Sequence, residues 1–226
     1  QDLVTNVGTG WVNAKDAAHR YMERIETQAQ ELEPDYDKGL RTRPLLFEDL
    51  KEPESDLVES LFPERISLLG RRSAQMHQAL ASHEELKGFE HEAFSLHYQR
   101  SLYSSLQSVT REAFENLRRS IPSLPVTIQA EAEAVLKRKN EVLDCFKRVF
   151  KHKINTVKIR THGDFQLGQL LWTGKDFVII NFEGEPSRPF SERRILRSGL
   201  RDVAAMIRSF HYAAYSPIMQ QNYAED

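Results

Sequence analysis

Apolar residues recur at helical spacing through the first two thirds of the chain. Steps of three and four residues place apolar side chains on one face of each of four predicted helices. These stretches lie near residues 14–32, 66–80, 102–117 and 128–149. Asn13 is predicted to cap the first helix, because an asparagine side chain accepts hydrogen bonds from the free amides of a first turn. Residues 33–55 are rich in charge and proline and predict a loop with one turn of helix.

The apolar period changes to two after Asn155, where Val157 and Ile159 alternate with polar neighbours as in a short strand. Two apolar segments, QLLWT and DFVIIN, then flank Gly174-Lys175. Glycine at the first central position favours a two-residue type II′ turn and therefore a hairpin. Helical spacing returns at the C-terminal end, on a face with Leu200, Val203, Ile207, Phe210 and Ala214. The pattern predicts a mainly α protein with a small β-hairpin.

Composition narrows the class of protein. The chain has 226 residues, enough for one sizeable domain, and its net charge is -2 without a basic stripe, which argues against nucleic acid as a partner. No apolar run is long enough for a membrane span, and no signal peptide is evident, so no membrane partner is expected. The single cysteine, Cys145, excludes a disulfide framework and favours a cytoplasmic location. Because the chain begins at Gln1, we expect it to be part of a longer protein.

The candidate chemistry lies around the hairpin. Asp164 follows a predicted strand in a His-Gly-Asp triplet, where a carboxylate can accept the proton of an attacking hydroxyl in phosphoryl transfer. Gln169 in the same loop and Asn181 at the end of the hairpin can offer oxygen atoms to Mg²⁺. A His-Gly-Asp triplet alone is also a common turn, but its coupling to a hairpin that ends in Asn-Phe-Glu-Gly is more specific.

Four further polar residues are weaker candidates for contact with the substrate or support of the loop. His162 is expected to be a structural hydrogen-bonding residue. Asp202 is expected to be a buried acid that binds loop amides, with a catalytic role as the alternative. Glu183 and Glu185 flank Gly184, and the pattern fits metal or substrate contact and a solvated turn equally.

Several segments resemble bacterial maltokinases, a family in the aminoglycoside-phosphotransferase-like branch of the protein-kinase fold. They are RTHGDFQLGQLLW, FVIINFEGEPSRPFSERR and SGLRDVAAMIRSFHYAAY, with weaker similarity in VTNVGTGW and LLGRRSAQMHQAL. The resemblance implies the C-terminal lobe of such a fold, with the N-terminal lobe absent. It also implies a hinge-like segment at 1–12, helices over 13–154, the catalytic loop and metal-site hairpin at 155–186, and C-terminal helices over 187–226.

The resemblance also implies a function. ATP and Mg²⁺ would be used to phosphorylate maltose to maltose 1-phosphate in trehalose and α-glucan metabolism. Asp164 would be the catalytic base, Gln169 a metal ligand, and Asn181 would stand where the family has its main metal-binding aspartate. The implied partners are the missing N-terminal lobe and a fused or associated trehalose synthase.

Three residues depart from the family pattern: Asn181 replaces an aspartate, Gln166 a histidine, and Thr9 an aspartate of the hinge. These departures keep a second hypothesis open, in which a catalytically impaired kinase lobe binds a sugar or a partner protein. A kinase for an aminoglycoside or another small alcohol is a third. This chain alone is expected to bind ATP poorly.

Overall fold

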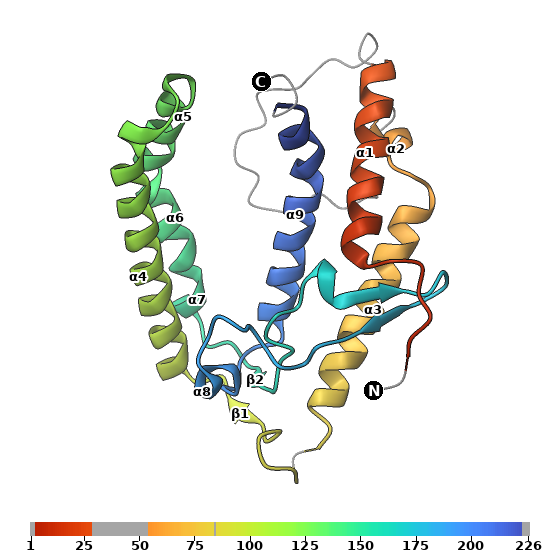
Figure 1. The fold of residues 1–226 in the computed structure, drawn as a ribbon. Helices are drawn as coiled ribbons and strands as arrows, with labels where there is room; N and C mark the ends of the chain where they lie inside the picture. The colour runs from red at the N-terminus through yellow and green to blue at the C-terminus, as the bar shows by residue number, and fades with distance from the viewer. Residues whose placement is uncertain (1–2, 29–53, 84, 223–226) are drawn as a thin grey trace. The chain divides into compact units, whose positions relative to one another are not determined.

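The computed structural model describes residues 3–28, 54–83 and 85–222, so most of the predicted loop over 33–55 lies outside the described residues. The chain divides into two compact units, one formed by residues 1–90 and 159–226 and the other by residues 91–158 (Figure 1). None of the described helices is long and apolar enough to cross a membrane. Helices predominate and the strands are short, which confirms the predicted mainly α class.

The first unit combines helices with the predicted hairpin. Its helices are α1 (Gly10–Gln28), α2 (Glu54–Leu57), α3 (Leu61–Leu80), α8 (Phe190–Arg193) and α9 (Leu200–Asn222). The hairpin strands are β3 (Leu170–Trp172) and β4 (Phe177–Ile179), preceded by the 3-10 turn η3 (Leu167–Gln169). Helices α1 and α9 pack side by side, and β4 contacts α3. The core gathers Ala14, Leu69, Met76, Phe165, Leu167, Leu170, Met206 and Ala213.

The hairpin has the predicted turn. Trp172 pairs with Phe177, and the amide of Thr173 donates to the carbonyl of Asp176 at 3.0 Å. Gly174 has φ +91°, whereas Lys175 has no positive φ, which distinguishes type II′ from type I′. The hairpin is held on α3 by two hydrogen bonds from the guanidinium of Arg72 to the carboxylate of Asp176, at 2.8 and 2.6 Å.

The predicted cap of α1 is wrong. The helix begins at Gly10, and the hydroxyl of Thr9 accepts a hydrogen bond from the amide of Val12 at 3.3 Å. Asn13 lies inside the first turn and donates its side-chain amide to the carbonyl of Thr9 at 2.9 Å. Thr9 also forms a β-bridge with Leu171, so the segment before α1 runs beside β3.

The predicted apolar face of α9 is wrong in part: Phe210 packs against the core, but the centre of the buried face lies elsewhere. Leu200 and Ile207 are 73% and 51% exposed. The buried face instead carries Asp202, Met206, Ser209, Ala213 and Pro217. Two of these residues are polar, and both bind the loop that precedes the hairpin. An apolar pattern therefore misses the face, because polar side chains with partners are buried on it.

The second unit is helical, with α4 (Leu96–Ser120), α5 (Val126–Lys137), α6 (Lys139–Phe146), α7 (Arg148–Lys151) and the short turn η2 (Ile121–Ser123). Its strands β1 (Glu92–Ala93) and β2 (Val157–Lys158) pair antiparallel. The single helix predicted near 128–149 is divided into three, with breaks at Arg138 and Lys147. Gln99 is fully buried and donates to the carbonyls of Val149 and His152. None of the predicted site residues belongs to this unit.

Candidate functional site

His162 fixes the start of the loop that carries Asp164, residues 161–169. Its side chain is 1% exposed, and Nε2 lies 2.8 Å from the carbonyl oxygen of Ile180, while Nδ1 lies 3.3 Å from the amide nitrogen of Asp164. A carbonyl can only accept and an amide can only donate, so a neutral ring with its proton on Nε2 satisfies both partners. His162 thus ties the loop to the end of β4, in agreement with the expected structural role.

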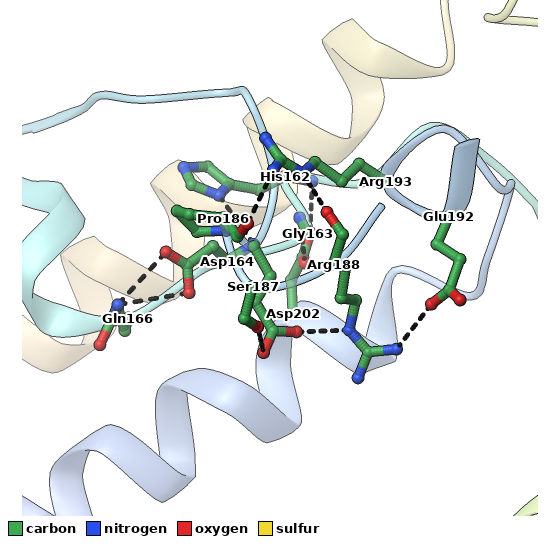
Figure 2. Close-up of polar contacts among 11 residues, drawn as sticks. His162, Gly163, Asp164, Gln166, Pro186, Ser187, Arg188, Glu192, Arg193 and Asp202 are labelled. Carbon is green, nitrogen blue, oxygen red and sulfur yellow. Dashed lines mark hydrogen bonds and ion pairs between the residues drawn. The ribbon is translucent and has the colours of Figure 1, made fainter. Parts of the chain in front are cut away.

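Asp202 binds the same loop from α9. Its carboxylate accepts the amides of His162 and Gly163 at 2.9 and 3.0 Å and contacts Nε2 of His77 at 2.9 Å (Figure 2 draws the loop contacts). Burial raises the pKa of Asp202, but the hydrogen bonds from His77, Gly163 and His162 outweigh it and hold the pKa below its ordinary value. Asp202 is therefore a buried carboxylate that binds loop amides, as expected from the sequence.

Asp164, Gln169 and Asn181 form one hydrogen-bonded chain. Nδ2 of Asn181 donates to Oε1 of Gln169 at 2.8 Å, and Nε2 of Gln169 donates to Oδ2 of Asp164 at 3.1 Å. Nε2 of Gln166 lies 3.3 Å from both carboxylate oxygens of Asp164 (Figure 2). The carboxylate is thus oriented by two neutral amides, and the structure brings the three strongest candidates of the sequence together.

Asn181 has an unusual backbone. Its φ is 62°, in the left-handed region that asparagine tolerates better than most residues. Two glycines nearby allow the loop that carries Asp164 and the segment after Asn181 to approach closely, since a Cβ on Gly163 would lie 3.2 Å from the Cα of Gly184. Both glycines have positive φ, so other residues would be strained there.

Glu183 and Glu185 differ in their hydrogen-bond partners. Glu183 is exposed and makes no hydrogen bond or ion pair within the described part of the chain. Glu185 accepts hydrogen bonds from the guanidinium of Arg188 and the hydroxyl of Ser187, and these two contacts lower its pKa. Glu185 is therefore already paired, whereas Glu183 is free to meet solvent or a ligand.

The described residues include few side chains that could coordinate a metal ion. No group of three or more His, Cys, Asp or Glu side chains among them could hold one. Gln169 and Asn181 could each offer an amide oxygen, although that of Gln169 now accepts from Asn181. Such neutral donors fit a Mg²⁺ ion that arrives with nucleotide phosphates better than a resident ion.

A pocket of about 900 Å³ opens beside the loop that carries Asp164. Asp164 lines it, whereas Gln169 and Asn181 do not. The other lining residues come from α1, the loops and α9: Trp11, Phe165, Gln166, Glu185, Ala205, Arg208, Ser209, Tyr212, Ser216 and Met219. Arg208 lies over the ring of Tyr212, 4.6 Å from its centroid, and donates to its hydroxyl at 2.8 Å.

Trp11, Arg208 and Tyr212 are pocket residues that the apolar pattern and the motifs do not predict. The spacing of Arg208 and Tyr212, four residues apart on a predicted helix, was the available signal, because such residues lie on one face.

The chain is similar in sequence and in structure to part of glucosamine kinase. No protein-family model matches the chain. The glucosamine kinase of Streptacidiphilus jiangxiensis is 24% identical over 165 residues, which cover 72% of this chain and 33% of that protein. A solved structure of glucosamine kinase, crystal form B, matches 93% of this chain and 40% of its own with a TM-score of 0.58 and 20% identity. Glucosamine kinase in complex with glucosamine, ADP and inorganic phosphate matches equally, with a TM-score of 0.58, 20% identity, and coverage of 93% and 39%.

The chain shares the fold of part of glucosamine kinase. It spans between a third and two fifths of the length of these proteins. This likeness agrees with the predicted kinase-like fold, and the assignment of the chain to the C-terminal lobe stays a prediction.

Proposed function

We propose that the chain provides the acceptor pocket and catalytic loop of an ATP-dependent sugar kinase, with maltose as the acceptor and maltose 1-phosphate as the product. The observation that carries this proposal is the carboxylate of Asp164, held by two amide donors and facing a pocket of about 900 Å³. The resemblance of the loop and hairpin segments to maltokinases and the likeness to a sugar kinase both support it.

The residues divide the work of the transfer. The anomeric hydroxyl of the sugar attacks the γ-phosphorus of ATP; its proton passes to Asp164 as the new O–P bond forms and the bond to the ADP oxygen breaks. Gln166 contacts both carboxylate oxygens of Asp164 and Gln169 donates to one of them, so together they keep the carboxylate in place. Asp202 and His162 keep the loop in place. Mg²⁺, held with the nucleotide by Gln169 and Asn181, would neutralise phosphate charge.

The pocket favours a neutral sugar over an amino sugar. Glu185 is committed to Arg188 and Ser187, so Asp164 is the one lining carboxylate without a cationic partner in the described chain. An ammonium group on the sugar would compete for the base itself. Trp11 and Tyr212 offer aromatic faces that suit the apolar faces of sugar rings, and Arg208 offers hydrogen-bond donors to hydroxyls.

A second candidate is a sugar-binding lobe without transfer activity. Asn181 donates its amide to Gln169 in place of presenting a carboxylate to a metal, which favours weak nucleotide binding.

Calorimetric titration of maltose and of glucosamine tests the acceptor. Maltose should bind, and Arg208→Ala and Tyr212→Ala should each weaken binding by roughly tenfold, about the value of a charge-assisted hydrogen bond or of an aromatic contact. Tyr215→Ala is the matched control, because Tyr215 is 59% exposed on the same helix and does not line the pocket. Tighter binding of glucosamine than of maltose would overturn the assignment of the sugar.

A further inference from the structure

The pocket beside Asp164 is long in the direction of α9. Its lining residues on this helix follow one another at helical spacing and therefore share one face: Ala205, Arg208, Ser209, Tyr212, Ser216 and Met219. At a rise of about 1.5 Å per residue, Ala205 and Met219 lie about 21 Å apart along the helix axis. One glucose unit lengthens a linear glucan by roughly one helical turn, about 5 Å. The lined face of α9 is therefore longer than the two rings of maltose.

The reacting end of the pocket lies beside the N-terminal half of α9. Asp202 and the hydroxyl of Ser209 both accept backbone amides of the loop that carries Asp164, so the helix is joined to this loop over its first turns. The lining continues for about 15 Å past Ser209. Ser216 and Met219, which we call the distal part of the pocket, lie at the far end of this lining.

The side chains along this face suit an uncharged ligand with hydroxyl groups and apolar faces. None of the six lining residues on α9 is acidic, and the charge of Arg208 is engaged, because its guanidinium lies over the ring of Tyr212 and donates to the hydroxyl of that residue. The other face of the Tyr212 ring is left for a ligand, since the residue is 55% exposed. Met219 is 56% exposed and offers an apolar thioether, and Ser216 offers a hydroxyl.

We infer that the distal part of the pocket is a subsite for further glucose units, so that linear α-glucans of three or more units are acceptors as well as maltose. The inference rests on the proposed function. The reacting unit lies beside Asp164, the second packs on Tyr212, and the third packs on Ser216 and Met219. A neutral glucan presents both hydroxyls and apolar ring faces, which is the chemistry that this lining matches.

The transfer step is the same for the longer acceptor. The anomeric hydroxyl of the reducing-end unit gives its proton to Asp164, its oxygen forms a bond to the γ-phosphorus of ATP, and the bond from that phosphorus to the ADP oxygen breaks. Maltotriose and ATP thus give maltotriose 1-phosphate and ADP. Because the added unit lies far from the reacting atoms, it should strengthen binding and leave kcat close to that for maltose.

Calorimetric titration of maltose and maltotriose into the full-length protein tests the subsite, with the rates of ATP-dependent phosphorylation measured in parallel. Maltotriose should bind at least about threefold more tightly than maltose, since the third unit adds an apolar contact and a hydrogen bond. Met219→Ala should weaken the binding of maltotriose by at least about threefold more than that of maltose. The exposure of Met219 means that this variant should still fold.

Ile218→Ala is the matched control, because Ile218 is the neighbouring residue on α9 and is not among those that line the pocket. It should bind both sugars as the unaltered protein does. Equal affinities for maltose and maltotriose, or equal effects of Met219→Ala on the two sugars, would overturn the subsite and leave the sugar kinase standing. Tighter binding of maltotriose with no transfer from ATP to either sugar would support the subsite and overturn the kinase. No binding of either sugar would overturn both.

Discussion

Asp202 connects α9 to the loop that carries Asp164 through a single buried carboxylate. Asp202→Asn would replace one accepting oxygen by an NH₂ group that faces an amide donor. We expect it to lower the free energy of unfolding by about 2–3 kcal/mol, the usual effect of breaking charged hydrogen bonds and leaving a buried donor unpaired. Denaturant unfolding near neutral pH would measure the loss. Asp16→Asn on an exposed face of α1 is the control and should change little.

The stabilisation by Asp202 should depend on pH in acid. Its pKa in the folded protein lies below the ordinary value of 3.8, so the folded state binds the proton less readily than the unfolded state. The contribution is therefore complete above the unfolded pKa and is lost as the pH falls through the lower, folded pKa. The stability difference between the protein and Asp202→Asn should shrink over that acidic range. A difference that stays constant there would contradict a charged Asp202.

The substitution Asn181→Asp tests whether Asn181 contacts the magnesium ion. Asn181→Asp places an anionic oxygen next to Gln169 with almost no change in shape, so the nucleotide-bound Mg²⁺ should be held more tightly. We expect faster maltose phosphorylation by the full-length protein and a lower magnesium requirement, measured in a magnesium titration of the rate. Asn140→Asp, on an exposed position of α6, is the control. Equal rates for the protein and Asn181→Asp across the titration would remove Asn181 from the metal site.

At the scale of single residues, the sequence predicts contacts between side chains that are close along the chain. Asp164, Gln169 and Asn181 flank a short hairpin, whose register alone brings them together. The sequence does not predict that Trp11 and Tyr212 line the pocket. They lie on α1 and α9, which are distant from Asp164 in the sequence, and local spacing carries no information on such contacts.

At the scale of elements, the start of α1 packs closely against Leu167 and Leu170, which follow Asp164 in the chain. A Cβ on Gly10 would lie 2.9 Å from the carbonyl oxygen of Leu167 and 3.0 Å from the side chain of Leu170. Gly10→Ala should therefore destabilise the protein by about 1–3 kcal/mol, since the neighbours are backbone and fully buried core. Thermal and denaturant unfolding would measure this effect.

Gly70→Ala is the matched control inside α3. Nothing lies within 4 Å of a Cβ there, and alanine is a better helix former, so we expect stabilisation by about 0.5–1 kcal/mol. Equal effects of the two substitutions would contradict the close approach at Gly10.

Element types were predictable, but their faces and ends were not always so. The type II′ turn follows from one glycine, because the backbone requirement is local. The buried face of α9 is set by Asp202 and Ser209, which both bind the loop before the hairpin. The hydroxyl of Ser209 accepts a hydrogen bond from the amide of Leu167 at 3.1 Å. Leu167 is distant from Ser209 in the sequence, so hydropathy alone does not reveal this contact. The apolar pattern instead places Ile207, which is 51% exposed, on the predicted face.

At the scale of the whole molecule, the two units should respond separately to substitution. Gln99 is 0% exposed and satisfies two carbonyls and the amide of Ile154 within the second unit. Gln99→Ala should lower the stability of that unit by about 1–3 kcal/mol, because three backbone groups lose their hydrogen bonds to a fully buried side chain. Hydrogen exchange followed by mass spectrometry should speed up over residues 96–120 and 148–154 and stay unchanged over 161–172. Equal acceleration in both regions would contradict two units.

The central claim is that Asp164 acts as the base of a sugar kinase. The most direct measurement is the rate of ATP-dependent maltose phosphorylation by the full-length protein and by Asp164→Asn, with maltose affinity measured in parallel by calorimetry. The account predicts that kcat falls by about 10²–10⁴-fold while maltose affinity stays within about threefold, because the amide keeps the shape of the pocket but cannot take the proton. An unaltered protein that transfers no phosphate to maltose, or an Asp164→Asn variant that retains most of its turnover, would contradict it.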